Sequence, residues 1–363
     1  MNILQLPRMI AGLTVTALSA SALTIELDYS HDAAGTDFFG TYTAAKSALE
    51  KAASDISDVL NSSLGEISTG NSESVSGSSG STTVNLDWRF SYTNPDDGSS
   101  ETLETFSRAA DAITIFVGSR ILGGSTLGQG GPGGAGFSLG IGGFESEWTA
   151  AMAAAETASN NIFSRGSQAP TIGNISGSST FGSTTANYSL NYGPVVGNLW
   201  FDRDTDNDGD TDTGTELNDY WHFDHTTAVD SGKIDFYSVA LHEILHAIGY
   251  GVSDTWSDNV SGTDWLGPNA IAEHGTGTGL IDGGGAHITA SISSTVFQDG
   301  ASQEVVMDPN ISTGQRKFLT DLDIAILQDL NYSAVPESGT FALLVGLVAL
   351  GSVASRRRRR RVV

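Results

Sequence analysis

The sequence predicts an α+β fold, with a twisted mixed β-sheet, a long helix that carries the candidate site, and a smaller C-terminal subdomain closed by a helix. Three patterns support this class. Apolar and polar residues alternate over residues 23–29 and 84–92, which is typical of half-buried strands. Apolar residues recur at helical spacing over residues 44–60, which predicts an amphipathic helix. Residues 235–250 are apolar on most sides and predict a buried helix.

The other elements follow in chain order from local composition. They are a Ser/Gly-rich surface loop over 68–83, a helix over 101–112, a buried strand over 113–117, an Ala-rich helix over 146–163, a second surface loop over 167–183, and strands over 186–191 and 198–202. Residues 118–143 are very rich in glycine, which predicts either a flexible surface loop or a loop close to a substrate. Thr320 and Asp323 match a helix cap, so a closing helix is predicted from there to about Leu330.

The composition narrows the classes of function. The chain of 363 residues has 17 basic and 42 acidic residues and a net charge of −25. Such a protein repels the phosphate backbone, so nucleic acid is not expected as a partner. The chain has no cysteine, which excludes a disulfide scaffold, a thiolate metal site and a cysteine switch that would hold a proenzyme inactive.

The first 22 residues have the composition of a secretory signal peptide. Arg8 gives a positive n-region, residues 9–18 are apolar, and Ala20 and Ala22 fit an A-x-A cleavage site. The apolar stretch is short for a membrane span. We therefore expect export and a mature chain that begins near Leu23.

The last 29 residues, 335–363, have the order of a sorting or anchoring segment. A Pro-Glu pair is followed by the apolar residues 340–354 and by six arginines over 356–361. By composition alone this is a transmembrane tail anchor with a positive flank. The order also resembles the PEP-CTERM sorting signal of Gram-negative bacteria, with Ser338 in place of the second proline. The resemblance implies an exosortase-like processing partner, transient membrane association, and delivery to the cell envelope or the outside.

The most informative feature is the H-E-x-x-H motif formed by His242, Glu243 and His246 within the predicted buried helix. Residues four apart share one helix face, so both imidazoles can point at one metal ion. Catalytic zinc takes three protein ligands and a water, and Glu243 is suitably placed to act as general base on that water. Burial of these groups without a metal would leave unsatisfied polar atoms. Asp235 is the predicted N-cap of the helix and Gly251 its stop signal.

A third protein ligand has to come from elsewhere in the chain. In the extended pattern H-E-x-x-H-x-x-G-x-x-H the next histidine position is Val252, whose side chain cannot bind zinc. The candidates are His287, His274, Asp254 and the pair His222 and His225. A second, structural zinc at His222 and His225 is a further alternative, although a structural site needs four ligands.

The motif and its surroundings resemble the metzincin class of zinc metallopeptidases over residues 198–332. Gly249 occupies the glycine position of the extended motif. As in the leishmanolysin-type branch, an insertion separates this glycine from a later histidine, His287, and Met307 and a closing helix follow. The strand and acidic loop before the motif, and the closing helix, are similar to those of matrixins. The absence of cysteine departs from leishmanolysin itself.

This resemblance implies roles for individual residues. His287 would be the third zinc ligand, and Met307 would form the Met-turn beneath the metal. The fold implied is metzincin-like, with a peptidase domain over residues 23–334. Its upper part would extend to about residue 251 and its lower part over residues 252–334.

The acidic loop before the motif predicts a calcium site. Its candidate ligands are Asp204, Asp206, Asp208, Asp210 and Asp212, with Gly209 at the turn. Alternate carboxylates suit a cation that takes six to eight oxygen ligands, and like charges repel one another without a cation. An EF-hand loop would have Glu at its twelfth position, which here is Thr215, so the alternatives are a looser calcium loop and a solvated acidic turn.

Taken together, these features predict a secreted or surface-delivered zinc endopeptidase that acts on a protein or peptide substrate. One alternative is a catalytically idle protein of the same fold that binds partners at the cell surface or in the matrix. Another is a zinc amidase. The intact Glu243 argues against the idle protein, because loss of this carboxylate is the simplest route to inactivity.

Overall fold

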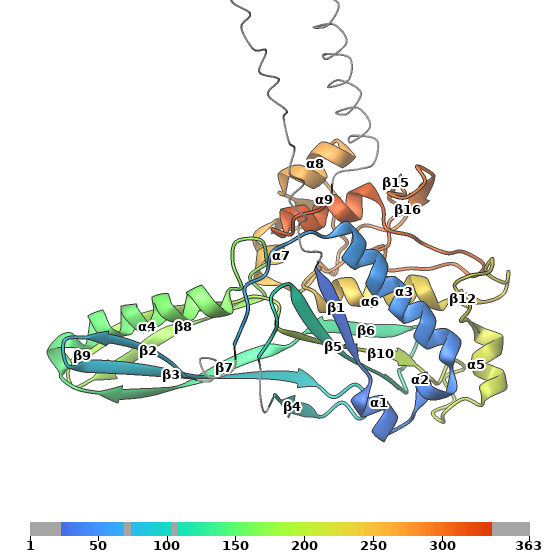
Figure 1. Ribbon diagram of the computed structural model, residues 1–363. Coiled ribbons are helices and arrows are strands. Elements are labelled where there is room, and N and C mark those ends of the chain that lie inside the picture. The colour runs from blue at the N-terminus through green and yellow to red at the C-terminus, as the bar shows by residue number, and fades with distance from the viewer. Residues whose placement is uncertain (1–22, 69–73, 104–106, 336–363) are drawn as a thin grey trace, which may run out of the picture.

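The computed structural model describes residues 23–68, 74–103 and 107–335. The predicted signal peptide, and the predicted sorting segment after Val335, lie outside these residues. Within them the fold is mixed α+β with twisted sheets, as the sequence predicts (Figure 1). No helix in the described ranges has the length and apolar character needed to cross a membrane.

The central sheet has four strands in the order β1-β5-β10-β6. They are β1 (Thr24–Asp28), β5 (Ala112–Arg120), β10 (Val196–Asp202) and β6 (Gly128–Pro132). The first three are parallel, and β6 is antiparallel to β10 at the edge. Strands β5 and β10 are almost entirely buried, as expected for parallel strands covered on both faces. The predicted strands over 23–29, 113–117 and 198–202 are confirmed.

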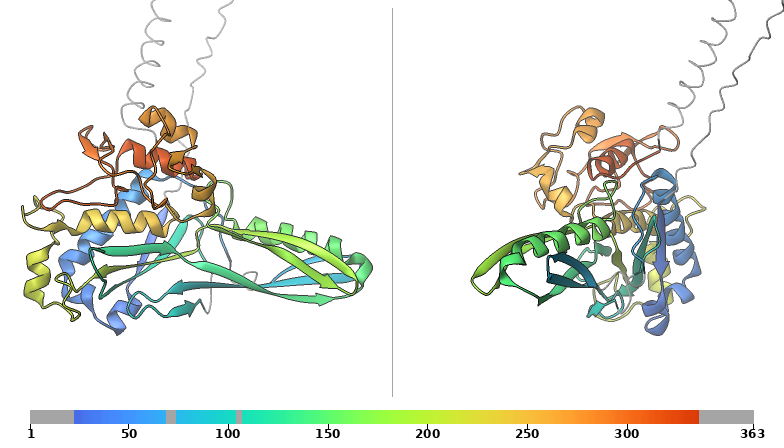
Figure 2. Two further views of the ribbon diagram at one scale, coloured as in Figure 1. Left: turned by 180° about the vertical axis from the view of Figure 1, so that it is seen from behind. Right: turned by 60° about the vertical axis from the view of Figure 1, so that its left-hand side comes forward.

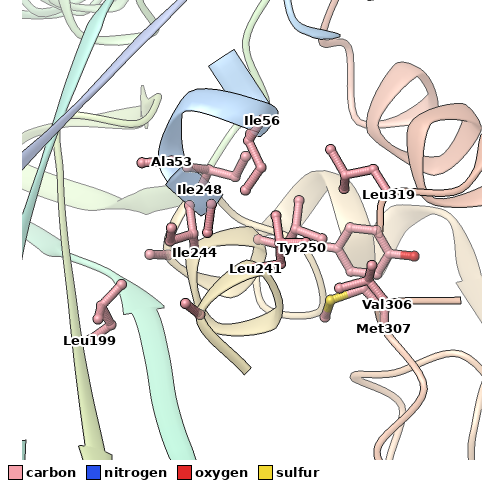
Figure 3. Packing of buried hydrophobic residues seen from close by; sticks show 14 of the residues in the cluster. Ala53, Ile56, Leu199, Leu241, Ile244, Ile248, Tyr250, Val306, Met307 and Leu319 are labelled. Atoms are coloured by element: carbon pink, nitrogen blue, oxygen red, sulfur yellow. The ribbon is translucent and has the colours of Figure 1, made fainter. Parts of the chain in front are cut away.

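Two helices cover one face of this sheet. The predicted amphipathic helix is α3 (Thr43–Val59), which packs against β1, and the motif helix is α6 (Phe236–Ala247), which packs against β6 and β10. The two helices also contact each other, with Ile56 of α3 close to Ile244 and Ile248 (Figure 3). Helix α6 is therefore enclosed on most sides by apolar groups.

The ends of α6 follow from its capping residues. The Asp235 carboxylate accepts hydrogen bonds from the Ser238 backbone N–H at 3.1 Å and from its hydroxyl at 2.6 Å, which confirms the predicted N-cap. The helix ends at Ala247, earlier than predicted. Gly249 has φ of 113°, a conformation that favours glycine, so Gly249 rather than Gly251 is the stop signal.

The glycine-rich segment 118–143 forms strands, and its prediction as a flexible surface loop is wrong. Strands β6 and β7 (Gly134–Gly142) occupy most of its second half. The glycines of β6 let the strand lie directly on α6. A β-carbon at Gly130 would be 2.1 Å from the carbonyl oxygen of Glu243, and one at Gly128 would be 2.9 Å from Cγ of Glu243. The glycine content therefore reflects close packing of backbone on backbone.

An elongated arm extends from the body of the molecule (Figures 1 and 2). It consists of β2 (Ser74–Ser79), β3 (Thr82–Thr93), β7, η1 (Glu145–Glu147), α4 (Trp148–Phe163), β8 (Gly173–Phe181) and β9 (Thr184–Tyr192). The short strand β4 (Ser100–Thr102) pairs with the end of β3. Helix α4 packs on β2, β3 and β9 around a second hydrophobic core that includes Trp88, Trp148 and Phe163. The predicted strands over 84–92 and 186–191 and the helix over 146–163 are confirmed.

Three predictions in and beside the arm are wrong. The Ser/Gly-rich segments 68–83 and 167–183 were expected as loops, but β2 and β8 lie within them. The segment 101–112 was expected as a helix, but β4 ends at Thr102 and residues 107–111 are not helical. In β2 and β8 the outward residues are small and polar, which hides the strand pattern from a reading based on apolar alternation.

The C-terminal part lies over α6 on the side away from the central sheet (Figure 1). Its elements are α7 (Asp254–Asp258), β13 (Val260–Ser261), β14 (Asp264–Trp265), α8 (Pro268–His274), β15 (Ser293–Thr295), β16 (Ser302–Glu304) and α9 (Asp321–Asp329). Helix α9 begins with a capping box between Thr320 and Asp323, which confirms the predicted closing helix. The remaining elements are α1 (Ser30–Ala34), α2 (Phe38–Thr41), α5 (Gly214–Tyr220), β11 (Trp221–His222) and β12 (Ile234–Asp235).

A buried arginine joins the arm to the body. The guanidinium of Arg165 is fully buried and donates to backbone carbonyls at distances of 2.6 to 2.9 Å. The acceptors belong to Gly65, Ala109, Ala112 and Pro194. One charged group thus satisfies carbonyls from three separate segments where the two hydrophobic cores meet.

The packing of β6 on α6 gives a first prediction. Gly130→Ala places a methyl group against the Glu243 carbonyl, so we expect a loss of about 1–3 kcal/mol in the free energy of unfolding. Gly131→Ala in the same strand is the matched control, because a β-carbon there has no neighbour within 4 Å. Chemical denaturation of both variants measures the difference. Equal denaturation midpoints for the two variants would show that β6 is not packed tightly against α6.

Candidate metal centre

The structure brings three histidine side chains to one point. His242 and His246 lie one turn apart on α6, and His287 lies in the loop between α8 and β15. Nε2 of His246 is 3.2 Å from Nε2 of His242 and 3.1 Å from Nε2 of His287. This is one of two groups of residues in the described part of the chain whose ligand atoms converge closely enough to hold a metal ion.

The other candidates for the third ligand lie elsewhere. Asp254 is the first residue of α7, and His274 is the last residue of α8. His222 and His225 lie before α6, in the segment that begins with β11. None of these four residues belongs to the histidine group.

Hydrogen bonds assign the tautomers of the two helix histidines. Nδ1 of His242 donates to the carbonyl of Val306 at 3.0 Å, and Nδ1 of His246 donates to the carbonyl of Tyr250 at 2.8 Å. A neutral imidazole has one N–H, so both Nε2 atoms carry lone pairs instead of protons. Two lone pairs that face each other at 3.2 Å repel unless a cation lies between them. Three neutral imidazoles, two of them with fixed Nδ1 partners, fit zinc.

Burial keeps these imidazoles neutral. It lowers the pKa of His246 to about 4 and the pKa of His242 well below its usual value. Burial also lowers the pKa of His287, although less, because this side chain is only half-buried. At neutral pH all three rings are therefore in the form that binds a metal without first losing a proton.

Glu243 is a buried acid beside the histidines. Burial raises the pKa of its carboxyl to about 8, and a hydrogen bond from the Gly130 backbone N–H opposes this rise. A carboxyl with such a pKa gains and loses a proton near neutral pH, which suits proton transfer. A cation held by the neighbouring histidines favours the ionised form, in which the group can accept a proton.

A cavity of about 720 Å³ opens onto these groups. Its lining includes strand β6, Val306, residues 308–311 and Lys317. Glu243 and the three histidines all line it, as does the partly exposed Val252. The glycine-rich segment, which the sequence left open as a loop near a substrate, thus lines the cavity as a strand.

The turn that orients His242 is itself held by the closing helix. Met307 is fully buried in this turn, next to Val306 and Tyr250 (Figure 3). The backbone N–H groups of Val306 and Met307 donate to the Asp323 carboxylate at 3.1 and 3.4 Å. The carbonyl of Met307 accepts from the N–H of Ile288, the residue after His287. The closing helix therefore fixes the segment that contacts His242 and the residue after His287.

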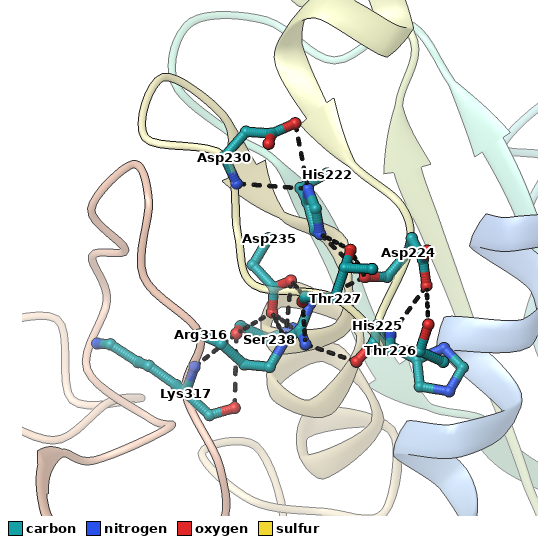
Figure 4. Close-up of polar contacts among 10 residues, drawn as sticks. All are labelled: His222, Asp224, His225, Thr226, Thr227, Asp230, Asp235, Ser238, Arg316 and Lys317. Atoms are coloured by element: carbon teal, nitrogen blue, oxygen red, sulfur yellow. Dashed lines mark hydrogen bonds and ion pairs between the residues drawn. The ribbon is translucent and has the colours of Figure 1, made fainter.

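An arginine clamps the start of α6 (Figure 4). The guanidinium of Arg316 donates to both carboxylate oxygens of the fully buried Asp235, with a shortest distance of 2.7 Å. It also donates to the carbonyls of His225 and Thr227. His222 contacts Thr227 and the Asp224 carbonyl in the same network. His222 and His225 thus belong to this clamp, and within the described residues no metal group includes them.

Sequence reasoning did not find this clamp. Arg316 and Lys317 are the one adjacent pair of basic residues between positions 23 and 335. In a chain with a large acidic excess, such a pair is the signal that could have drawn attention to the segment. The backbone N–H of Lys317 donates to the hydroxyl of Ser238 at 2.7 Å, so both basic residues contact the first turn of α6 or its cap.

The acidic loop brings together three of its five aspartates. Carboxylate oxygens of Asp204, Asp206 and Asp208 lie within 4.8 Å of one another. Asp212 instead accepts from the backbone and hydroxyl of Thr205, at 2.8 and 2.5 Å, and Asp210 is not in the group. The structure thus separates the five candidate ligands into three that converge and two that do not.

Comparison of the chain with protein-family models, with curated protein sequences and with solved structures finds no match. The case for a function therefore depends on the geometry of the site.

The clamp gives a second prediction. Arg316→Met leaves the buried Asp235 carboxylate without its cation, so we expect a loss of roughly 3–5 kcal/mol in the free energy of unfolding. Lys233→Met is the control, because Lys233 pairs with an exposed aspartate and should cost less than about 1 kcal/mol. Denaturant unfolding compares the two. Similar losses in the free energy of unfolding would mean that the Arg316–Asp235 ion pair stabilises the protein no more than a surface ion pair does.

Proposed function

We propose that this protein is a zinc-dependent endopeptidase. The observation that carries the proposal is the convergence of three imidazole nitrogens, two of them held unprotonated by hydrogen bonds at Nδ1, beside a buried glutamate in an open cavity. Three protein ligands with an open position are typical of catalytic zinc, whereas structural zinc has four. The class we propose is metzincin-like, with His242, His246 and His287 as ligands and Met307 in the Met-turn.

The residues of the site have separable roles. When bound, zinc would polarise a scissile carbonyl and make a nearby water more acidic. Glu243 would accept a proton from the attacking water and pass it to the leaving amine. The carbonyls of Val306 and Tyr250 hold the imidazoles of His242 and His246 in the binding tautomer and orientation.

The shape of the cavity favours a peptide substrate. Strand β6 is at the edge of the central sheet and lines the cavity along its whole length. An edge strand offers backbone donors and acceptors with which an extended peptide can pair. This arrangement supports an endopeptidase over an amidase, because an endopeptidase binds an extended chain on both sides of the cleaved bond. The predicted signal peptide and sorting segment support export to the cell envelope or beyond.

Glu243→Gln tests the proposed catalytic role. The amide keeps the size of the side chain but cannot accept the proton, so we expect hydrolysis of a protein substrate such as casein to fall by about 10²–10⁴-fold. Zinc content, measured by atomic spectroscopy, should stay at one equivalent. A variant as active as the native protein would remove Glu243 from the mechanism, and a native protein that binds zinc without cleaving any substrate would favour the idle binding protein.

His287→Ala tests the third ligand. Loss of one of three ligands should reduce zinc affinity by orders of magnitude, because a two-histidine site lacks the coordination that catalytic zinc requires. His274→Ala is the matched control, since His274 lies at the end of α8 outside the histidine group. Competition with a chelator measures both affinities. A full equivalent of tightly bound zinc in His287→Ala would contradict the assignment.

We also propose that the acidic loop binds calcium through Asp204, Asp206 and Asp208. Three converging carboxylates repel one another, and a hard cation with oxygen ligands relieves this. The loop follows β10 and precedes α5, so a bound cation would pin the chain between the central sheet and the motif helix.

Removal of calcium tests this site. A ligand that binds only the native state stabilises it, so a calcium-selective chelator should lower the thermal midpoint while zinc stays bound. Asp206→Asn should abolish the effect of the chelator, and Asp210→Asn, outside the group, should preserve it. An unchanged midpoint in the native protein would identify the loop as a solvated acidic turn.

A further inference from the structure

His287 differs from the other two histidines in how its ring is held. His242 and His246 each lie on a buried helix and donate Nδ1–H to a carbonyl. His287 lies in a loop, and the carboxylate of Asp282 is 3.8 Å from its Nδ1, which is too long for a hydrogen bond. Within the described residues, the position of this ring therefore depends on the backbone of its loop.

Two side-chain groups hold that backbone. The Asp282 carboxylate accepts from the backbone N–H of Gly285 at 2.8 Å and of His287 at 3.3 Å. On the other side of the same turn, the indole N–H of Trp256 donates to the carbonyl of Gly285 at 2.8 Å. Trp256 comes from α7, about thirty residues earlier in the chain, so it ties the inserted segment to the loop of the third ligand.

The indole of Trp256 is rigid because it is in the middle of an aromatic column. It is 1 % exposed and packs between Tyr250 and Trp265, with ring centroids 4.7 and 4.6 Å away. The Trp265 indole N–H donates to Asp329 of α9 at 2.9 Å, which anchors the far end of the column on the closing helix. The carbonyl of Tyr250, at the near end, accepts from His246.

Gly251 brings the end of the motif segment into contact with the same loop. Its φ is 78°, and a β-carbon there would be 2.3 Å from the carbonyl oxygen of Ala286 and 3.0 Å from the ring of His246. Gly251 therefore lies between the ring of His246 and the carbonyl just before His287, where there is no room for a side chain.

We infer that Trp256 is a positioning residue for the third metal ligand, and that the inserted segment between Val252 and His287 is a buttress for the metal centre. The indole of Trp256, packed between the rings of Tyr250 and Trp265, fixes the carbonyl of Gly285, two residues before His287. Groups that orient metal ligands from outside the coordination shell typically contribute 10- to 100-fold to metal affinity. This inference rests on the proposed function, because it takes the three histidines as the metal ligands.

Trp256→Phe and Trp265→Phe form a matched pair that tests the inference. Both residues are 1 % exposed in one aromatic column, and each substitution removes one indole N–H, but only that of Trp256 contacts the loop of His287. We expect zinc affinity, from chelator competition, to fall about 10- to 100-fold in Trp256→Phe and to change by less than about threefold in Trp265→Phe. The visible absorption of the cobalt-substituted protein should change in Trp256→Phe only.

A second pair tests whether the loop of His287 has to lie close to the motif segment, in case Trp256→Phe does not fold. Gly251→Ala and Gly262→Ala both place a side chain at positive φ, 78° and 65°, but a β-carbon at Gly262 has no neighbour within 4 Å. We expect Gly251→Ala to weaken cobalt and zinc binding and Gly262→Ala to leave it near that of the native protein. Circular dichroism establishes that each variant is folded.

The outcomes separate this inference from the proposed function. Native affinity and an unchanged cobalt spectrum in folded Trp256→Phe would overturn the positioning role, as would equal losses in Trp256→Phe and Trp265→Phe. If the native protein itself binds no zinc, the proposed function fails first. If it binds zinc and loses it in His287→Ala, while Trp256→Phe binds normally, only the buttress fails.

Discussion

The hydrogen bonds from His242 and His246 to backbone carbonyls are the constraint on which the arrangement of the site depends. Each bond fixes the proton on Nδ1 and leaves a lone pair on Nε2, pointing at a common centre. The two acceptors lie in different segments, so both have to be placed against α6 at once. Asp323 holds the turn that carries Val306, and Gly249 and Gly251 bend the chain so that the Tyr250 carbonyl reaches His246. The two imidazoles therefore take up this arrangement only when the C-terminal part has folded against α6.

Much of the central body could be predicted from the sequence because its elements show strong periodic patterns. The strands over 113–117 and 198–202 are short apolar runs, and the helices α3 and α9 have clear spacing or caps. The arm was harder to predict. Its outward strand faces carry serine, threonine, asparagine and glycine, whose local preferences favour turns, and packing of β2 on α4 and pairing of β8 with β9 override those preferences. The glycines of β6 likewise look like loop residues until α6 is placed against them.

The local part of the site could be predicted and the non-local part could not. His242, Glu243 and His246 are adjacent on one helix, so their spacing alone places them together. His287 is brought to them by a loop. The spacing of histidines along the chain did not identify His287 as the third member of the group. The order of segments in the family resemblance did. Arg316, Asp323 and Trp256 act through contacts between segments that are far apart in the chain. No local pattern encodes such contacts, and the supporting residues of the site become visible only in the folded protein.

The two hydrophobic cores also determine which parts of the molecule can unfold locally. The arm has its own buried cluster around Trp88 and Trp148, and the site lies in the other cluster, with Arg165 at the junction. Regions with separate cores exchange their amide hydrogens as separate cooperative units. Amides in β8 and β9 can thus become exposed in a partial opening that leaves α6 protected. Local unfolding would then begin at the distal arm, while the histidine cluster stays in a body that is still closed.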